Sequence, residues 1–255
     1  MTDLRVQYKV KKTSRKEPNS AEITITNLSQ QTRAAMKAKG ARVVLQAGYV
    51  GTVSQIFAGD ARVITHVHEH DKGDWSTILR CGDGERAYLF GQISKSYGAN
   101  TPVRTVLNDV VAALGIDPGN SRDVTISESF LNGYVAHGRA ATELERLLKG
   151  RGFAWSVQDG RLQILGQTAT TSTITVLSAK SGLVGSPEFG TPDKKGGPSY
   201  LKIKSLLQPQ IRPGGKIKLD SISVKGTFRA VTVEHEGDTA GGNWYTTVDA
   251  LPVTT

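Results

Sequence analysis

Two stretches decide the fold of this chain: HEHDKGDWSTILRC at residues 68–81 and HEGDTAGGNWYTTVDA at residues 235–250. Both begin with a His-Glu pair, pass through a polar segment that contains an Asp, and reach a Trp with a Thr two positions later. This match sets His68 against His235. The spacing differs only within segments of loop composition. We therefore predict two related β regions in one chain.

The order of features upstream of both stretches also matches. Residues 40–47 and 215–221 each begin with Gly and continue with alternating apolar residues, and residues 23–28 resemble residues 201–206. Alternation with a period of two puts one face of a strand in a core and the other toward solvent or a partner. We predict a mainly β fold in which two similar small β-barrel, tube-like domains flank a small α+β domain, because barrel closure removes edge strands.

Trp75 and Trp244 open the matching strands. We expect both to anchor a core or a hairpin rather than to line a binding site, and replacement by Ala to cost about 3–5 kcal/mol if the ring is buried. The duplication also has a geometric consequence. Three copies of the chain would place six similar domains in a ring, with quasi-sixfold symmetry on one side and threefold symmetry on the other.

Helical periodicity is expected in three segments. The first begins at Ser29, a suitable N-cap residue, and stops at Gly40. In the second, Thr101 is the expected cap, Pro102 suits the first helical position, and Gly115 ends the helix. The three segments are residues 29–39, 101–115 and 140–149.

The last of these helices is followed by a strong hairpin pattern. Asp159-Gly160 lies between two alternating runs within residues 153–165, which is the strongest short-range indication of a β-hairpin. Residues 186–199 are rich in Gly, Pro, Lys and Asp and are predicted to form a long loop. The predicted domains are residues 1–96 (first barrel), 97–165 (α+β) and 166–255 (second barrel).

Composition excludes several classes of protein. The chain has 255 residues, enough for a substantial core, and a single Cys, which excludes a disulfide scaffold. No apolar run reaches 18 residues, and the charged first 16 residues lack the apolar segment of a secretory signal. We expect Cys81 to be a buried small apolar side chain rather than a nucleophile.

The charge of the chain is uneven. The formal net charge is +9, with basic clusters in residues 1–20 and 194–218 and an acidic excess in residues 220–249. Such clusters can contact phosphate, an acidic protein or anionic lipid. Only Tyr8 and Tyr200 lie among the basic residues, too few aromatic residues for a stacking platform that binds single strands. A protein interface or a solvated face is favoured, and a basic nucleic-acid-binding module is the alternative.

Three histidines, His66, His68 and His70, share one face of a predicted strand. Three imidazoles can bind zinc and leave a fourth position open, so a metal-dependent hydrolase is a further alternative. The chain has only two other histidines, His137 and His235, and it lacks the alternating strand–helix pattern of metallo-hydrolases. An exposed hairpin strand is the favoured interpretation.

Other catalytic patterns are weak. Residues 82–87 match the loose dinucleotide fingerprint Gly-x-Gly-x-x-Ala, but they follow an antiparallel strand, and residues 88–94 are expected to continue as β. A turn is favoured there. No nucleophile elbow and no phosphate-binding loop occur. We therefore assign no catalytic, cofactor-binding or metal-ligating residues and no cofactor.

Short motifs in both β regions carry a resemblance. They are residues 23–29, 32–33, 43–49, 56–59, 74–77 and 81–84 in the first part, and residues 209, 213–214, 231–235, 237–238 and 244–246 in the second. With these motifs the chain resembles the phage tail baseplate hub proteins, the late-control protein D-like hubs of contractile tails, which are related to the hub part of type VI secretion spike proteins. The middle segment is similar only in character.

The resemblance implies a structural virion protein and not an enzyme. It implies a homotrimeric hub that adapts the sixfold tail tube to the threefold central spike. The implied partners are a separate spike protein, the tail-tube end, the baseplate wedge proteins, and the tape-measure protein or DNA in the channel, with no membrane. The implied location is the virion tail baseplate, assembled in the cytoplasm of the bacterial host.

Overall fold

The computed structural model describes residues 4–36, 41–69, 73–166, 168–190 and 199–253. The chain divides into two compact units. The first, called the sheet unit, comprises residues 1–14, 19–82 and 170–255, and the second, called the α+β unit, comprises residues 15–18 and 83–169. Each is described by itself.

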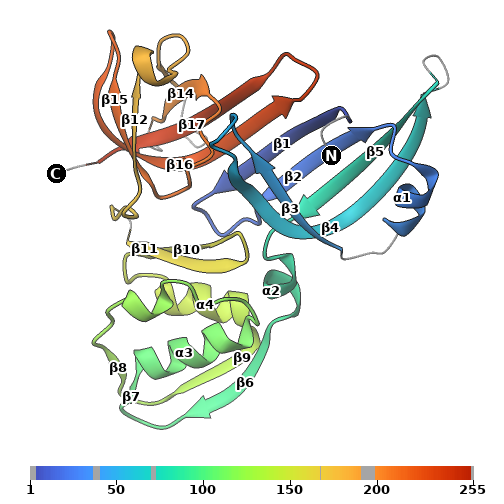
Figure 1. The fold of residues 1–255 in the computed structure, drawn as a ribbon. Coiled ribbons are helices and arrows are strands. Elements are labelled where there is room, and N and C mark those ends of the chain that lie inside the picture. Colours follow the sequence, from blue (N-terminus) through green and yellow to red (C-terminus); the bar gives the residue numbers. More distant parts are fainter. Residues whose placement is uncertain (1–3, 37–40, 70–72, 167, 191–198, 254–255) are drawn as a thin grey trace. The chain divides into compact units, whose positions relative to one another are not determined.

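The sheet unit is built on one 11-stranded sheet (Figure 1). Its strands follow the order β13-β14-β17-β16-β1-β2-β5-β4-β3, and β12 joins through β15, which pairs with β16. The mainly β fold is confirmed. No closed barrel is found in the described part of the chain, so the two-barrel arrangement is not confirmed. The strands are β1 (Val6–Thr13), β2 (Ser20–Thr26), β3 (Arg42–Ala47), β4 (Ser54–Glu69), β5 (Asp74–Gly82), β12 (Ile174–Ser178), β13 (Glu188–Phe189), β14 (Leu201–Leu206), β15 (Lys216–Asp220), β16 (Lys225–Asp238) and β17 (Trp244–Pro252).

The predicted repeat is present in the strand pairing of the sheet unit. In the first half β4 pairs with β3 and β5, and β5 pairs with β2; in the second half β16 pairs with β15 and β17, and β17 pairs with β14. Both long strands carry a bulge at the same place, after Ala61 in β4 and after Ala230 in β16. The sheet unit therefore consists of two halves with one pairing scheme, called the first half and the second half.

The register corrects the alignment of the repeat. His66 lies opposite Thr77, and His235 lies opposite Thr246. The two hairpins therefore align without a gap when His66 is matched with His235. His68 therefore corresponds to Gly237 and not to His235. Likewise, residues 23–28 correspond to 203–208 rather than 201–206. Residue-type similarity suggested the wrong register because alternating strands resemble one another at every even shift.

The helix after β2 begins as predicted. The Ser29 hydroxyl caps α1 (Gln30–Ala35) by accepting a hydrogen bond from the N–H of Thr32 at 3.1 Å. The C-cap is Met36, and the predicted stop at Gly40 lies outside the described residues.

The α+β unit packs its helices against one apolar core. The larger apolar residues of the predicted second helix are buried there, namely Val103, Val106, Leu107, Val110, Val111 and Leu114. The hairpin around Asp159-Gly160 is also confirmed, with positive φ at both residues. Its elements are α2 (Glu85–Phe90), β6 (Gln92–Tyr97), β7 (Thr101–Pro102), α3 (Val103–Ala113), β8 (Ser129–Phe130), β9 (Tyr134–Arg139), α4 (Ala140–Leu148), β10 (Phe153–Gln158) and β11 (Arg161–Gly166).

Two local predictions in this unit are wrong. Thr101 does not cap α3, because it pairs with Phe130 in the β7–β8 ladder and Pro102 occupies the N-cap position. Tyr88 belongs to the helix α2 and not to a strand. Gly84, with φ of +68°, redirects the chain just before that helix, and the predicted strand starts only at Gln92.

Candidate functional surface

One face of the sheet is polar and continuous across both halves. Residues directly opposite one another in neighbouring strands share a face, and the pairing sets Glu236, Lys9, Glu22 and Arg80 in one row across β16, β1, β2 and β5. Their charges alternate in sign along that row. Lys9 Nζ lies 2.8 Å from Glu234 Oε1, and Arg80 Nε lies 3.0 Å from Glu22 Oε2. We call this surface the polar face.

The opposite face of the sheet forms two apolar cores. The first half buries residues such as Val10, Ile23 and Leu79, and the second half buries residues such as Ile203 and Val248. The alternation predicted from the sequence therefore separates a packed face from a solvated one.

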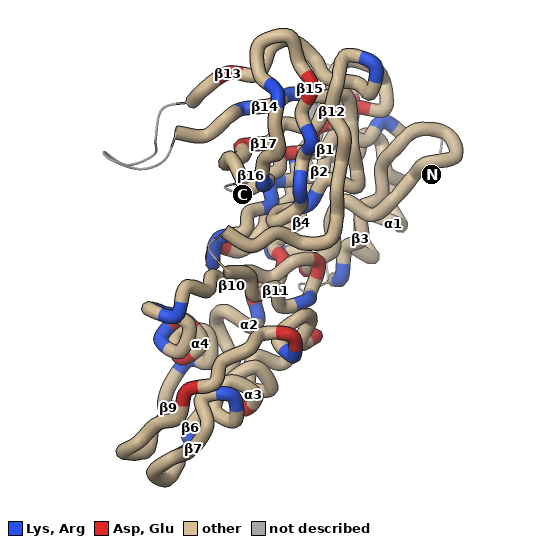
Figure 2. The backbone as a smooth tube through the Cα atoms, turned by 90° about the vertical axis from the view of Figure 1, so that its left-hand side faces the viewer, with Lys and Arg blue, Asp and Glu red and all other residues tan. Residues whose placement is uncertain are grey.

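Part of the basic N-terminal charge is matched by the acidic C-terminal stretch, through Arg5 and Lys9. Arg5 makes a two-atom contact with Asp238, with a shortest distance of 2.7 Å, and Gln7 donates to the same carboxylate at 3.0 Å. The Arg5 contact is the main reason that the pKa of Asp238 is lowered to about 2. Figure 2 shows both signs of charge interspersed along the sheet. The N-terminal cluster is therefore not a bare cationic patch.

The second basic cluster lies partly on the polar face. Lys202 and Lys204 project from β14 and are exposed, and the Lys204 ammonium lies 4.1 Å from the centre of the Tyr245 ring. Two further lysines of the cluster, Lys194 and Lys195, lie outside the described residues.

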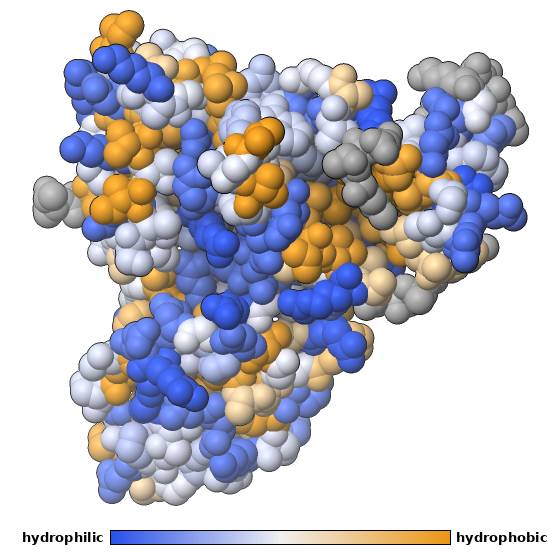
Figure 3. Space-filling view, viewed as in Figure 1, coloured by the Kyte–Doolittle hydropathy of each residue, from blue (hydrophilic) through white to orange (hydrophobic). Residues whose placement is uncertain are grey.

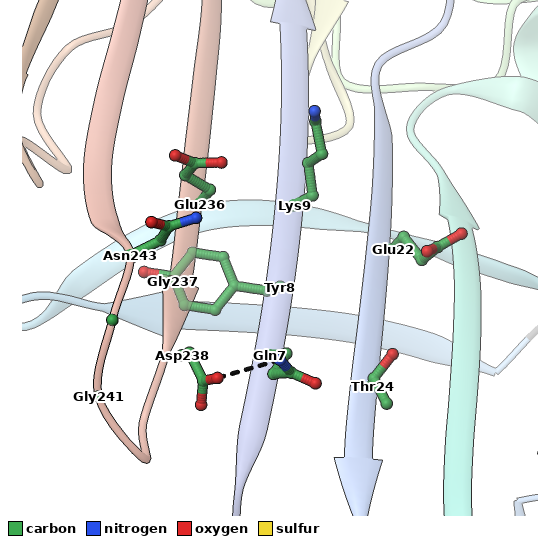
Figure 4. A pocket seen from close by; sticks show the side chains of 11 residues that line it. Gln7, Tyr8, Lys9, Glu22, Thr24, Glu236, Gly237, Asp238, Gly241 and Asn243 are labelled. Carbon is green, nitrogen blue, oxygen red and sulfur yellow. Dashed lines mark hydrogen bonds between the residues drawn. The ribbon is translucent and has the colours of Figure 1, made fainter.

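A depression of about 490 Å³ opens where β1 lies between β16 and β2. Gln7, Lys9, Glu22 and Glu236 line it side by side (Figure 4). Gly237 is required at its edge, because a Cβ there would lie 2.5 Å from the Tyr8 ring. The lining mixes both charges on neighbouring strands, which suits a contact surface better than a catalytic cleft.

The predicted histidine cluster is only partly described. His66 Nδ1 lies 3.0 Å from the Thr77 hydroxyl, and the His68 ring packs against Trp75 at 4.8 Å. His70 lies outside the described residues. No group of three or more His, Cys, Asp or Glu side chains suited to a metal is found among the residues that the structure describes.

His235 is the counterpart of His66 and is buried. Its Nδ1 lies 2.9 Å from the Thr246 hydroxyl, which repeats the His66–Thr77 contact. Burial, together with the positive charge of Lys12, lowers the pKa of His235 to about 3. Nothing in the sequence pattern singles out this buried pair, since the polarity of His and Thr suggests exposure.

Residues 82–87, which match the loose dinucleotide fingerprint, contain a buried aspartate whose structural role the sequence did not predict. The buried Asp83 carboxylate accepts hydrogen bonds from the backbone N–H groups of Asp159 at 2.6 Å and Gly160 at 2.8 Å. A Cβ at Gly84 would lie 2.6 Å from Val157. Asp83 therefore holds the tip of the β10–β11 hairpin.

Three further sequence predictions concern single side chains. Trp75 lies at the start of β5, as its second residue, and Trp244 begins β17, but both rings are only partly buried. Arg33 lies over the Trp75 ring at 4.1 Å, and Tyr8 meets Trp244 edge-on at 5.6 Å. Cys81 is 2% exposed, and burial raises the pKa of its thiol to about 11, which agrees with an inert apolar role.

Figure 3 shows apolar patches within a largely hydrophilic surface. No described helix has the length and apolar character needed to cross a membrane. The large apolar side chains that are exposed in the sheet unit include Val44, Val63, Val67, Ile174, Val176, Phe189, Leu206 and Ile222.

Comparisons with known proteins agree on one family and one fold. Residues 1–250 match the family model described as Baseplate hub gp41. No curated protein matches the chain. Among solved structures, the 43 kDa tail protein of prophage MuSo2 from Shewanella oneidensis is similar with a TM-score of 0.66 and 10% identity, covering 99% of this chain and 97% of that one.

Two further structures share the fold. The tail protein from Neisseria meningitidis MC58 has a TM-score of 0.64 at 9% identity over 96% of this chain and 91% of its own. The E. coli c3393 protein, a component of the type VI secretion system, has a TM-score of 0.65 at 12% identity over 99% of this chain and 74% of its own.

Proposed function

Because the chain belongs to the Baseplate hub gp41 family, we propose that it performs its structural role in the tail baseplate as a homotrimer that adapts a sixfold tail tube to a threefold central spike. It is a structural tail protein and not an enzyme. The observation that carries the proposal is the repeat of the sheet unit, in which one chain supplies two halves with one pairing scheme.

Three such chains would present six similar half-sheets to a tube. The two halves of a chain carry different side chains at equivalent positions, such as His68 in the first half and Gly237 in the second. A ring of three chains would therefore be only threefold symmetric at surfaces formed by such positions. The parts assigned from the sequence, residues 1–96 and 166–255, are proposed to form the tube-like ring, and residues 97–165 are proposed to form a separate α+β domain.

The proposed partners are those that the resemblance to baseplate hub proteins implies. They are the tail-tube end, the central spike, the baseplate wedge proteins, and the tape-measure protein or DNA in the channel. The polar face is the surface proposed to line that channel, because its alternating charges hydrate well and offer no continuous apolar contact to a passing polymer. Assembly is proposed to occur in the cytoplasm of the bacterial host.

Light scattering of the purified chain, at low and at high salt, tests the proposal. We expect a mass of about three times the 27.3 kDa of the chain. A monomer at every concentration would contradict a trimer that forms from this chain alone. A dimer or tetramer would contradict the sixfold-to-threefold geometry itself.

A further inference from the structure

The two halves of the sheet unit differ at one edge. Strand β1 pairs with β16 along residues 232–238, on the side of β16 away from β17. The matching edge of β4, at residues 63–69, has no strand beside it in the described part of the chain, since β3 pairs only with residues 54–60. Exposure reflects this: His66 is partly exposed where His235 is 1% exposed, and Val67 is 41% exposed.

The second half contains the counterpart of β1. The N–H of Thr26 donates to the carbonyl of Arg5, and at the matching place the N–H of Leu206 donates to the carbonyl of Gly182. Further along, Phe189 lies opposite Leu201 as Val10 lies opposite Ala21. Residues 182–190, which contain β13, therefore run beside β14 as β1 runs beside β2. We call them the β13 segment.

The outer edge of the β13 segment is also unpaired among the described residues. The effect is large at one position: Val10 is 0% exposed because β16 covers it, whereas its counterpart Phe189 is 71% exposed. Among the described residues, these two open edges each correspond to one side of the β1–β16 ladder that the chain already forms.

We propose that the β13 segment of one chain pairs antiparallel with the β4 edge of a second copy. The pairing repeats the β1–β16 ladder between copies and rests on the proposed trimer. Transferring the register places Phe189 opposite the neighbour's His66, as Val10 lies opposite His235, and Glu188 opposite Val67, as Lys9 lies opposite Glu236.

A second copy fits these edges better than an unrelated partner for a structural reason. Each copy offers one edge of each kind, so the contact is head-to-tail and closes into a ring when the rotation per copy permits. Strand addition supplies main-chain hydrogen bonds and also covers edges that would otherwise invite aggregation. Phe189 would leave solvent for the apolar side of the neighbouring sheet.

Cysteine cross-linking of the full chain tests the pairing. The Cys81→Ala background removes the native thiol and puts there the Ala that the second half has at position 250. The backbone N–H of Thr26 donates to the carbonyl of Arg5, so odd-numbered residues of β1 make their backbone hydrogen bonds to β2. Lys9 therefore makes none to Glu236 opposite it, and such a non-hydrogen-bonded pair has Cα atoms about 4.5 Å apart. Val67→Cys with Glu188→Cys is therefore within disulfide reach.

We expect mild oxidation of that double variant to give covalent trimers that are resolved on a non-reducing gel. The matched control is Val63→Cys with Glu188→Cys, which moves one thiol four residues, about 13 Å, along the same exposed strand. Equal cross-linking of the control overturns the register. A trimer by light scattering that does not cross-link through Val67 and Glu188 overturns the pairing and leaves the trimeric hub standing.

A second variant tests the same edge without a disulfide. Phe189→Asp places a charge where the neighbouring core would cover it, so we expect loss of the trimer with an unchanged unfolding temperature of the monomer. Ile222→Asp is the control, because Ile222 is also exposed but lies in the connection between β15 and β16, outside both edges. A Phe189→Asp chain that still forms trimers overturns the proposal, and a wild-type chain that is monomeric throughout removes both the trimer and this pairing.

Discussion

At the scale of single residues, a few buried polar side chains hold the folded chain together. The Asp83 carboxylate accepts hydrogen bonds from two backbone N–H groups of the β10–β11 turn. The hydroxyls of Thr77 and Thr246 form hydrogen bonds with the equivalent histidines His66 and His235. Such groups are costly to bury without a partner and stabilising with one. Their loss is therefore expected to be measurable one residue at a time.

Asp83→Ala should lower the free energy of unfolding by about 2–4 kcal/mol, because two partly buried N–H groups lose their acceptor and the buried site loses its polar partner. Asp83→Asn keeps one acceptor oxygen and should lose less. Chemical denaturation followed by Trp155 fluorescence, within the α+β unit, measures both. An Asp83→Ala chain as stable as wild type would show that water replaces the carboxylate without cost.

The stability of the sheet unit should fall at acid pH through His235. Its pKa is about 3 in the folded chain and about 6.5 when unfolded. Between these values the unfolded state binds the proton and the folded state does not. The free energy of unfolding should therefore fall by up to about 1.4 kcal/mol per pH unit as the pH drops below 6.5.

Denaturation curves from pH 7 to pH 4 check this slope. His235→Gln should lose the histidine part of it, whereas His66→Gln, at the equivalent but partly exposed site, should retain it. An identical slope in wild type and in His235→Gln would assign the pH dependence to carboxylates instead.

At the scale of elements, the long hairpins β4–β5 and β16–β17 determine the sheet. In each hairpin the backbone carbonyl of a Trp accepts a hydrogen bond from the end of a neighbouring strand. Trp75 accepts it from the N–H of Asn27 at 2.7 Å, and Trp244 accepts it from the N–H of Leu207 at 2.9 Å. The rings lie at the hairpin ends rather than in the cores. The Trp therefore contributes through its position in the strand as well as through its ring.

Replacing either Trp by Ala should cost roughly 2 kcal/mol, less than the 3–5 kcal/mol of a fully buried ring. Thermal unfolding of Trp75→Ala and Trp244→Ala measures it, with Tyr245→Ala as the control beside Trp244. A loss of 4 kcal/mol or more would mean that the rings are covered in the solution state, for example by another copy.

At the scale of the whole molecule, charge pairing predicts weak binding of nucleic acid. The basic β1 lies against the acidic β16, so Arg5 and Lys9 already have carboxylate partners. We expect little binding of duplex or single-stranded DNA in a fluorescence anisotropy titration at low salt. Tight binding that weakens steeply with added salt would favour the nucleic-acid-binding alternative.

The sequence alone predicted the mainly β fold, the duplicated hairpins, the Ser29 cap and the Asp159-Gly160 turn, because these depend on local periodicity and turn chemistry. It also predicted a hub from motifs spread along both halves. It did not predict that β1 joins the two halves, that Asp83 holds a turn 76 residues away, or that His66 matches His235. Those facts depend on strand register and on contacts between distant segments, and periodicity of two leaves register open until the strands pair in three dimensions.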